Sequence, residues 1–301
     1  MAKMHDGGPA ATPAIADGAV YTYERTGTVK CFDAKTGVEK WSFNVPKELG
    51  VKNTFFGAVS SPLVTGKLVV VELGVIVAID KASGKLRWKS KPYRAGNGSS
   101  MTYTHDGKIR IASLNEDGLV ILDPSDGSEI CRHDWRCGNN QTHAATPIEF
   151  GGMMFVSSGY GLGSCLLNIS SGIDAKVVWD SDQIGNQFAN SIFCGGHLYG
   201  PNGNFGGEGA PIQCVRTSDK KLLWQEDSIK NASLILAGDK FIILTDAGEL
   251  ISAEFSPDGC KEIARSQILG KTCWTAPILS NGLLYCRNSK GRVVCLDVRK
   301  E

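Results

Sequence analysis

Short alternating runs of apolar and polar residues, separated by glycine-rich turns, dominate this chain. Residues 15–41, 63–88, 103–130 and 278–298 share one order of features: a turn glycine, a run of β-branched and aromatic residues, a second glycine, and an apolar run that ends in Asp. Alternation with a period of two residues is typical of half-buried strands. The pattern therefore predicts an all-β fold built from repeated strand–turn–strand units.

The repeat recurs with a period in the mid-forties. The first turn glycines of its seven copies are spaced by 41 to 48 residues: Gly18, Gly66, Gly107, Gly152, Gly196, Gly238 and Gly282. Propeller blades have this length, and twisted four-stranded sheets pack face to face in propellers. We predict a seven-bladed β-propeller of four-stranded antiparallel blades over residues 11–301, after an N-terminal extension of residues 1–10. The repeats are expected near 11–45, 58–91, 100–136, 145–181, 189–226, 232–266 and 275–298.

Each repeat is expected to contain four strands. The first strands are predicted at Thr12–Ile15, Ser61–Val64, Thr146–Ile148 and Ala276–Leu279. Second strands are predicted at Ala19–Tyr23 and Leu68–Glu72, and third strands at Thr28–Asp33, Val75–Asp80 and Val293–Asp297. The fourth strand carries a periodic Trp, which is expected to be buried between neighbouring blades: Trp41, Trp88, Trp135, Trp179 and Trp224.

The seventh repeat stops at Val298, before a fourth strand, and residues 1–10 contain no Trp-bearing strand to supply one. The last blade is therefore expected to be incomplete or imperfectly closed, and the alternative is that a further blade lies upstream. An open edge of this kind could accept the strand of a partner.

The repeat resembles that of the PQQ-like propeller family. The residues that carry the resemblance follow the pattern Gly-x-[VL]-Tyr … Gly-x-[VL]-x-[AC]-[LFI]-Asp-x-x-[TS]-Gly-x-x-x-Trp, which is strongest at 15–41, 63–88 and 278–298. The family includes quinoprotein dehydrogenases and bacterial envelope proteins, and the chain most resembles the uncharacterised envelope members. For a dehydrogenase the resemblance implies PQQ stacked between a Trp and a vicinal disulfide, together with Ca²⁺. This sequence has no adjacent cysteines, and no acidic cluster with the spacing of a Ca²⁺ site lies in the loops that lead into first strands, so neither PQQ nor Ca²⁺ is supported as a cofactor.

Composition narrows the classes of partner and compartment. The net charge of +1 arises from 32 basic and 31 acidic residues, which gives no electrostatic reason to expect nucleic acid or an anionic membrane. No apolar stretch has the length of a membrane span, and no signal peptide is recognisable at the start. A cytoplasmic monomer is expected from the chain as written. The resemblance implies the periplasm or cell envelope if further sequence precedes it.

Cysteines and histidines show no catalytic or metal-binding motif. The ten cysteines include no CxxC pair and are expected to be buried free thiols, with a local disulfide between Cys131 and Cys137 as the alternative. Cys31, Cys214 and Cys295 share one position in the third strand and are predicted to be packing residues. His105 lies beside a turn glycine and is expected to be solvated. No HExxH, GxSxG or P-loop motif occurs.

The loops that lead into the first strands are the least repetitive parts of the chain, and function concentrates in such loops. They contain amides, aromatics and one histidine, which suit a small ligand or a peptide. An equally open interpretation is that the amides only satisfy buried backbone groups. Trp274 departs from the rhythm of the other tryptophans and is predicted to line the channel mouth, or else to lie in the core between blades. The candidate binding residues are Phe56, Arg94, Asn97, Asn140, His143, Gln187, Asn190 and Trp274.

The function predicted is that of a non-catalytic scaffold that binds a protein or small ligand through one propeller face. One alternative is a PQQ-dependent alcohol or sugar oxidoreductase. The other is a structural fragment of a larger envelope protein.

Overall fold

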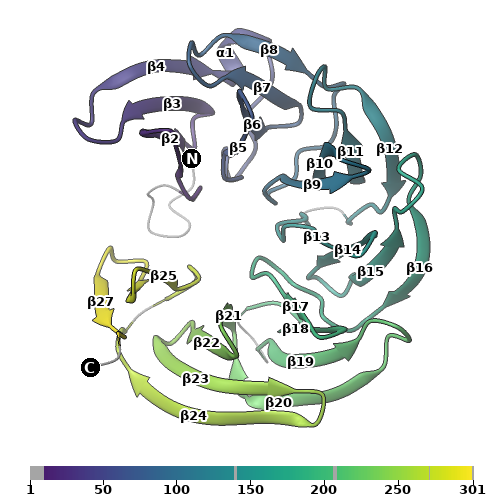
Figure 1. Ribbon diagram of the computed structural model, residues 1–301, viewed down its shortest axis with the longest axis vertical. Helices are drawn as coiled ribbons and strands as arrows, with labels where there is room; N and C mark the ends of the chain where they lie inside the picture. The colour runs from purple at the N-terminus through teal and green to yellow at the C-terminus, as the bar shows by residue number, and fades with distance from the viewer. Residues whose placement is uncertain (1–9, 139–140, 206–208, 271, 300–301) are drawn as a thin grey trace. The chain divides into compact units, whose positions relative to one another are not determined.

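The computed structural model describes residues 10–138, 141–205, 209–270 and 272–299, and residues 1–9 of the predicted N-terminal extension lie outside it. Within these residues the strands form seven sheets, each a meander of strands adjacent in sequence (Figure 1). Six sheets have four strands and the seventh has three. The prediction of an all-β, seven-bladed propeller with an incomplete last blade is confirmed. We number the sheets in chain order.

The first three sheets cover the N-terminal half of the chain. The first comprises β1 (Ala14–Ala16), β2 (Ala19–Tyr23), β3 (Thr28–Asp33) and β4 (Glu39–Asn44). The second comprises β5 (Leu63–Thr65), β6 (Leu68–Glu72), β7 (Ile76–Asp80) and β8 (Leu86–Lys89). The third comprises β9 (Met101–His105), β10 (Lys108–Asn115), β11 (Gly118–Leu122) and β12 (Glu129–Asp134).

Four further sheets follow. The fourth comprises β13 (Ile148–Phe150), β14 (Met153–Ser158), β15 (Gly163–Asn168) and β16 (Lys176–Ser181), and the fifth comprises β17 (Ile192–Cys194), β18 (His197–Pro201), β19 (Pro211–Arg216) and β20 (Leu222–Lys230). The sixth comprises β21 (Ala232–Ala237), β22 (Lys240–Thr245), β23 (Glu249–Ser256) and β24 (Gly259–Gln267). The seventh comprises β25 (Ile278–Ser280), β26 (Leu283–Arg287) and β27 (Val293–Asp297).

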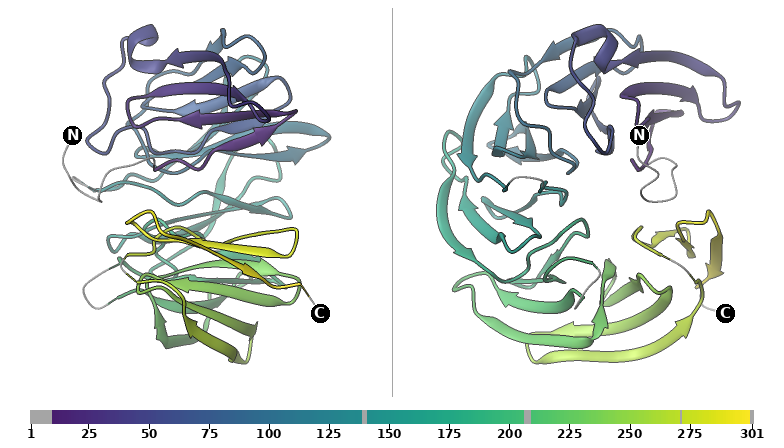
Figure 2. Two further views of the ribbon diagram at one scale, coloured as in Figure 1. Left: turned by 90° about the vertical axis from the view of Figure 1, so that its left-hand side faces the viewer. Right: turned by 180° about the vertical axis from the view of Figure 1, so that it is seen from behind.

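A single short helix, α1 (Val45–Leu49), is found among the described residues, and it is drawn as a coiled ribbon after β4 (Figures 1 and 2). Asn44 caps it, because its side-chain oxygen accepts a hydrogen bond from the N–H of Lys47, and Gly50 ends it in the left-handed conformation. Over the part of the chain that is described, no helix has the length and apolar character needed to cross a membrane.

The four predicted first strands each begin later than the sequence pattern suggested. β1, β5, β13 and β25 each start directly after a proline: Pro13, Pro62, Pro147 and Pro277. Proline has no N–H to donate to a strand ladder, so pairing begins one residue beyond it. The second and third strands of the first sheet have the predicted bounds.

The chain divides into two compact units, and the division passes through the fourth sheet. Unit 1 comprises the chain up to Val156 with Leu167–Val178, and unit 2 comprises Ser157–Leu166 with the chain from Trp179 onward. In unit 1, buried side chains of the first and second sheets form one hydrophobic cluster, and those of the second and third sheets form another. In unit 2, one cluster joins the fifth and sixth sheets and another joins the sixth and seventh.

Tryptophans connect successive sheets inside each unit. In unit 1, the indole N–H of Trp41 donates to the carbonyl of Lys81 at 3.0 Å, and that of Trp88 donates to Pro124 at 2.8 Å. In unit 2, Trp179 and Trp224 donate to Thr217 and Ser256, each at 2.7 Å. Every acceptor lies at or beside the turn after the third strand of the next sheet. The predicted role of these rings between blades is confirmed for these four.

Trp135 does not belong to this series, contrary to the prediction from its spacing. It follows the end of β12, and the residue of β12 that pairs with Ile121, where a Trp would be expected, is Cys131. The ring of His105 lies over Gly172 in the next turn, just as the ring of Trp41 lies over Gly84. The side chain of His105 is only 18% exposed, so the expectation that it is solvated was wrong.

All ten cysteines are free thiols, and the alternative of a disulfide between Cys131 and Cys137 is not realised. Cys31 and Cys214 are buried, as predicted for packing residues. Cys295 is exposed instead, because the seventh sheet has no fourth strand beyond β27 among the described residues. Its position in the repeat alone therefore did not determine its burial.

Candidate functional site

The sequence-predicted binding residues fall into two groups, one in each unit. Phe56, Arg94, Asn97 and His143 lie in unit 1, whereas Gln187, Asn190 and Trp274 lie in unit 2. Asn140 lies outside the described residues. Each group is considered by itself.

His143 is a buried structural residue in unit 1. Its ring stacks on the indole of Trp135, with centroids 5.0 Å apart and planes 8° apart, and its Nε2 lies 2.8 Å from the Trp135 carbonyl oxygen. The His143 carbonyl accepts hydrogen bonds from the N–H groups of Asn97 at 2.7 Å and Gly98 at 3.1 Å. Burial lowers the pKa of the imidazole, which favours its neutral form. Asn97 and His143 are thus brought together, through the backbone of two loops.

Arg94 and Phe56 make separate contacts. The guanidinium of Arg94 donates to the Glu116 carboxylate at 2.9 Å, and its backbone N–H donates to Asp117 at 2.8 Å. The carbonyl of Phe56 accepts a hydrogen bond from Nε of Arg25 at 3.0 Å. The Phe56 ring meets the exposed ring of Phe55 edge to face, with centroids 5.1 Å apart. Arg94 is therefore committed to an ion pair, and Phe56 belongs to an aromatic pair.

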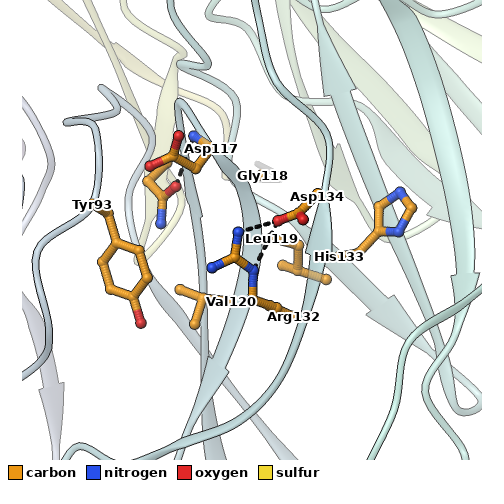
Figure 3. Close-up of a pocket in the computed structure, with 9 residues that line it drawn as sticks. Tyr93, Asp117, Gly118, Leu119, Val120, Arg132, His133 and Asp134 are labelled. Carbon is orange, nitrogen blue, oxygen red and sulfur yellow. Dashed lines mark hydrogen bonds and ion pairs between the residues drawn. The ribbon is translucent and has the colours of Figure 1, made fainter.

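A shallow hollow lies where β11 begins and β12 ends, and its empty space of about 160 Å³ is partly open to solvent (Figure 3). Figure 3 shows the Arg132 guanidinium turned toward the Asp134 carboxylate, with the ring of Tyr93 on the other side. Nε of Arg132 donates to Asp134 at 2.8 Å, and Asp117 accepts a hydrogen bond from Arg136 at 3.1 Å. The hollow is small and these charges are already paired, so it is a weak candidate for a ligand site.

Glu72 is a buried acid that no motif indicated. Its Oε1 accepts hydrogen bonds from the N–H groups of Gly74 at 3.0 Å and Gly96 at 3.2 Å, and it thereby links the turn after β6 to the loop that carries Asn97. Oε2 has no hydrogen-bond partner among the described residues. Burial raises the pKa of the carboxyl to about 8, so it is largely protonated at neutral pH. The only sequence signal was a Glu at the end of an apolar strand, Leu68–Glu72.

Three loops of unit 2 bring together an aromatic cluster, which we define as Phe188, Phe205 and Trp274. The ring of Phe188 lies 5.1 Å from that of Trp274, at an interplanar angle of 46°, and 4.4 Å from that of Phe205, at 57°. Trp274 is 37% exposed, and both phenylalanines are half-buried. The three loops connect β16 to β17, β18 to β19, and β24 to β25. Tilted aromatic pairs of this kind contribute about 0.5–1.5 kcal/mol each beyond the area they bury.

Amide side chains hold these loops in place. Oε1 of Gln187 accepts a hydrogen bond from the N–H of Phe205 at 2.8 Å, and its Nε2 donates to the Tyr160 hydroxyl at 3.2 Å. Asn186 donates from Nδ2 to the carbonyl of Pro201 at 2.9 Å and is buried. Amides therefore satisfy backbone groups here, and the same bonds fix the aromatic rings. Asn190, in the same loop, is exposed.

The structure thus adds Phe188, Phe205 and Tyr160 to the predicted residues Gln187 and Trp274. Phe205 and Tyr160 lie outside the loops that lead into first strands, which is why the sequence did not single them out. Phe188 stands in such a loop, between Gln187 and Asn190, so an aromatic residue beside two amides was the available signal.

The groups that the quinoprotein resemblance implies do not fit the described residues. Across residues 10–138, 141–205, 209–270 and 272–299, no three His, Cys, Asp or Glu side chains gather to hold a metal ion. The cysteines are free thiols, none adjacent in sequence to another. Within these ranges the vicinal disulfide against PQQ is therefore not provided, and no cluster of three carboxylates is provided for Ca²⁺. That the protein uses neither cofactor stays a prediction.

Solved structures with the same fold include a BamB protein and a quinohemoprotein dehydrogenase. The structure resembles that of BamB from Moraxella catarrhalis with a TM-score of 0.74 at 16% identity, over 95% of this chain and 82% of that chain. It resembles the quinohemoprotein alcohol dehydrogenase from Comamonas testosteroni with a TM-score of 0.67 at 14% identity, over 92% of this chain and 62% of that chain. Likenesses at these identities show a shared fold only.

Sequence comparison gives relatives among the BamB proteins. The outer membrane protein assembly factor BamB of Moranella endobia is 24% identical, over 95% of this chain and 74% of that protein. The protein of the same name from Salmonella typhimurium is 23% identical, over 95% of this chain and 73% of that protein. The profile of the PQQ_2 family, described as outer membrane protein assembly factor BamB, matches residues 1–226. The repeat pattern had predicted a PQQ-like propeller without distinguishing its members, and that prediction is confirmed. This chain belongs to the BamB family of PQQ-like propellers.

Proposed function

We propose that this propeller is a non-catalytic scaffold that binds a protein partner through the loops around the aromatic cluster of Phe188, Phe205 and Trp274. The observation that carries the proposal is a half-exposed Trp packed on two Phe rings and supplied by three separate loops. Trp is enriched among the residues that dominate protein–protein binding energy. The Trp274 indole already packs against the ring of Phe188. It can therefore bury its remaining surface against a partner without a large loss of side-chain entropy.

The rigidity of the loops supports recognition of a protein surface. The hydrogen bonds of Gln187 to Phe205 and Tyr160 fix two of the three loops before any partner arrives. In the third loop, Nε of Arg287 donates to Oγ1 of Thr275, the residue after Trp274, at 3.0 Å. Preorganisation of this kind raises affinity because less conformational freedom is lost on binding. The relatives are called outer membrane protein assembly factors, so we infer a partner that acts in outer membrane protein assembly.

Site-specific crosslinking in the source cell tests this proposal. A photo-crosslinking amino acid replaces Phe188 in one variant and Ile263 in a matched control, because Ile263 is an exposed apolar residue of β24 in the same unit. We expect an adduct at Phe188, identified by mass spectrometry as an outer membrane assembly protein, and none at Ile263. Equal adducts at both positions, or adducts only with unrelated proteins, would refute the proposal.

Affinity for the purified crosslinked protein gives the second measurement. We expect Trp274→Ala to weaken binding by roughly 2 kcal/mol, about 30-fold, and Ile263→Ala to leave it unchanged. Unaltered affinity of Trp274→Ala would remove the aromatic cluster from the interface. Circular dichroism on both variants verifies that the fold is retained.

Quinone-dependent oxidation is the rival function, and it can be tested directly. The purified protein is titrated with PQQ and Ca²⁺ while Trp fluorescence and dye-linked oxidation of alcohols and sugars are followed. We expect no saturable quenching and no turnover. Saturable quenching with turnover would overturn the scaffold proposal.

A further inference from the structure

Two buried cysteines share the hydrophobic cluster that joins the sixth and seventh sheets. Cys273 lies in the loop from β24 to β25, directly before Trp274, and Cys286 lies on β26. Both are free thiols in the structure, and they are 0% and 2% exposed. The other buried members of the cluster are Leu244, Leu269 and Leu284. The two thiols therefore occupy one apolar environment inside unit 2.

The two thiols are close enough for one to affect the ionisation of the other. Burial is the main cause that raises the pKa of Cys286 to about 11, and the charge of the Cys273 thiolate is the second cause. Among the described cysteines with a raised pKa, Cys286 is the only one for which another cysteine is a cause. Cys273 and Cys286 are therefore the pair of thiols to consider together.

Hydrogen bonds on either side of these cysteines hold the loop against β26 and the turn after it. The N–H of Ser289 donates to the Thr272 carbonyl at 2.8 Å, and Nε of Arg287 donates to Oγ1 of Thr275 at 3.0 Å. Backbone pairing of this kind brings the Cα atoms of neighbouring segments to about 4.5–5.5 Å. Cysteines joined by a disulfide have Cα atoms about 4.4–6.8 Å apart. The separation of the two segments therefore suits a disulfide between them.

We propose that Cys273 and Cys286 form a disulfide bond that anchors the loop carrying Trp274 to β26. The oxidant is a disulfide, either of a small thiol such as glutathione or of a protein. The thiolate of one cysteine attacks it to give a mixed disulfide, and the thiolate of the other displaces the remaining thiol to form the Sγ–Sγ bond. The two cysteines lose two electrons and two protons in total, and the oxidant is reduced to two thiols.

Burial places this reaction during folding. The reactive species is the thiolate, and burial raises the pKa of both thiols in the folded protein, so exchange after folding requires the loop to open. The same burial shields the finished disulfide from reductants. A disulfide that closes a loop of about 15 residues, the approximate separation of these cysteines, lowers the equilibrium constant for unfolding by roughly 100-fold.

A tryptic digest tests the proposal directly. Residues 272–287, TCWTAPILSNGLLYCR, follow a lysine and end in an arginine, so both cysteines leave in one peptide. The full chain is refolded from the reduced, unfolded state with reduced and oxidised glutathione, then denatured, alkylated without reduction, digested and analysed by mass spectrometry. We expect this peptide without alkyl groups and lighter than the dithiol by two hydrogens. Cys31 and Cys214, which are also buried, should be alkylated. Alkylation of both cysteines in the peptide, or disulfides from them to other cysteines, would overturn the proposal.

Chemical denaturation of the oxidised and reduced protein gives a second measurement. We expect the unfolding equilibrium constant of the unsubstituted chain to be roughly 100-fold lower after oxidation. Oxidation should have no effect on Cys273→Ser or on Cys286→Ser, whereas the matched control Cys214→Ser should keep the full difference. An equal effect of oxidation in Cys273→Ser would contradict the assigned pair. Neither measurement involves a binding partner, so this proposal and the one for the aromatic cluster can fail separately.

Discussion

The first and seventh sheets carry the same cross-strand Tyr–Cys pair, which is Tyr21–Cys31 in one and Tyr285–Cys295 in the other. The pair is core in the first sheet and surface in the seventh. In the first sheet it lies in one hydrophobic cluster with Trp41 and with valines and Ile79 of the second sheet. The seventh sheet buries only its other face, through Leu284 and Cys286, against the sixth sheet. The apolar–polar alternation is alike in both sheets, so the burial of a given residue depends on which neighbours the rest of the fold supplies.

Thiol reactivity should show the largest contrast between these sheets. In the native protein we expect Cys295 to react with an alkylating reagent at the rate of an exposed thiol. Cys31 is buried and can react only when the protein unfolds locally or globally. Its rate of alkylation should therefore be lower by at least about 10³-fold. Mass spectrometry of time points measures both rates in one sample. Comparable rates would mean that the first sheet is not packed as described.

Removal of one aromatic ring from the first sheet and of one from the seventh should change the free energy of unfolding by very different amounts. Trp41→Ala deletes a buried ring and its hydrogen bond to Lys81, and we expect a loss of about 3–5 kcal/mol. Tyr285→Ala deletes a ring that is already partly in solvent, so the loss should be under about 1 kcal/mol. Chemical denaturation measures both. A larger loss for Tyr285→Ala would show that something in solution covers the seventh sheet.

The buried carboxyl of Glu72 should make the stability of the protein depend on pH. The pKa of Glu72 is raised to about 8 by burial, with the nearby Glu116 carboxylate as a minor cause. Between its ordinary pKa and about 8 the native state holds a proton that the unfolded state releases, so this group's contribution to stability falls as pH rises through that window. Glu72→Gln should therefore be near neutral at pH 5 and stabilising by roughly 3–5 kcal/mol at pH 9.

The matched control for Glu72 lies in the seventh sheet. Arg287 ends β26 as Glu72 ends β6, and it is exposed. Arg287→Gln should change the free energy of unfolding by under about 0.5 kcal/mol at either pH. A pH dependence shared by both variants would argue against Glu72 as its source.

The smallest effect concerns the glycine beneath Trp41. A Cβ at Gly84 would lie 2.7 Å from the Trp41 ring, whereas a Cβ at Gly18 would meet no atom within 4 Å. Both glycines have a positive φ, +70° and +72°, so an alanine is strained equally at each. We expect Gly84→Ala to cost about 1–3 kcal/mol more than Gly18→Ala. This excess should vanish when both alanines are compared in a Trp41→Ala background.

The repeat made the strands and turns predictable, because alternation and turn glycines are local signals. The misassigned Trp135 shows the limit of spacing: Cys131 holds the Trp position, and a histidine from β9 fills the space. Glu72 could not be recognised as buried, since its environment comes from a loop more than twenty residues later. The cluster of Phe188, Phe205 and Trp274 joins three loops whose proximity depends on the fold.

The tryptophan hydrogen bonds bear on how such a protein changes in evolution. Trp41, Trp88, Trp179 and Trp224 all donate forward, to a carbonyl of the following sheet. The second and fifth repeats therefore each carry both a donor for the following repeat and an acceptor for the preceding one. When such a repeat is duplicated in tandem, the new junction inherits a matched donor and acceptor without any further mutation. Arrays of this kind can change in length by gene duplication at little structural cost, and adaptation is concentrated in the terminal repeats.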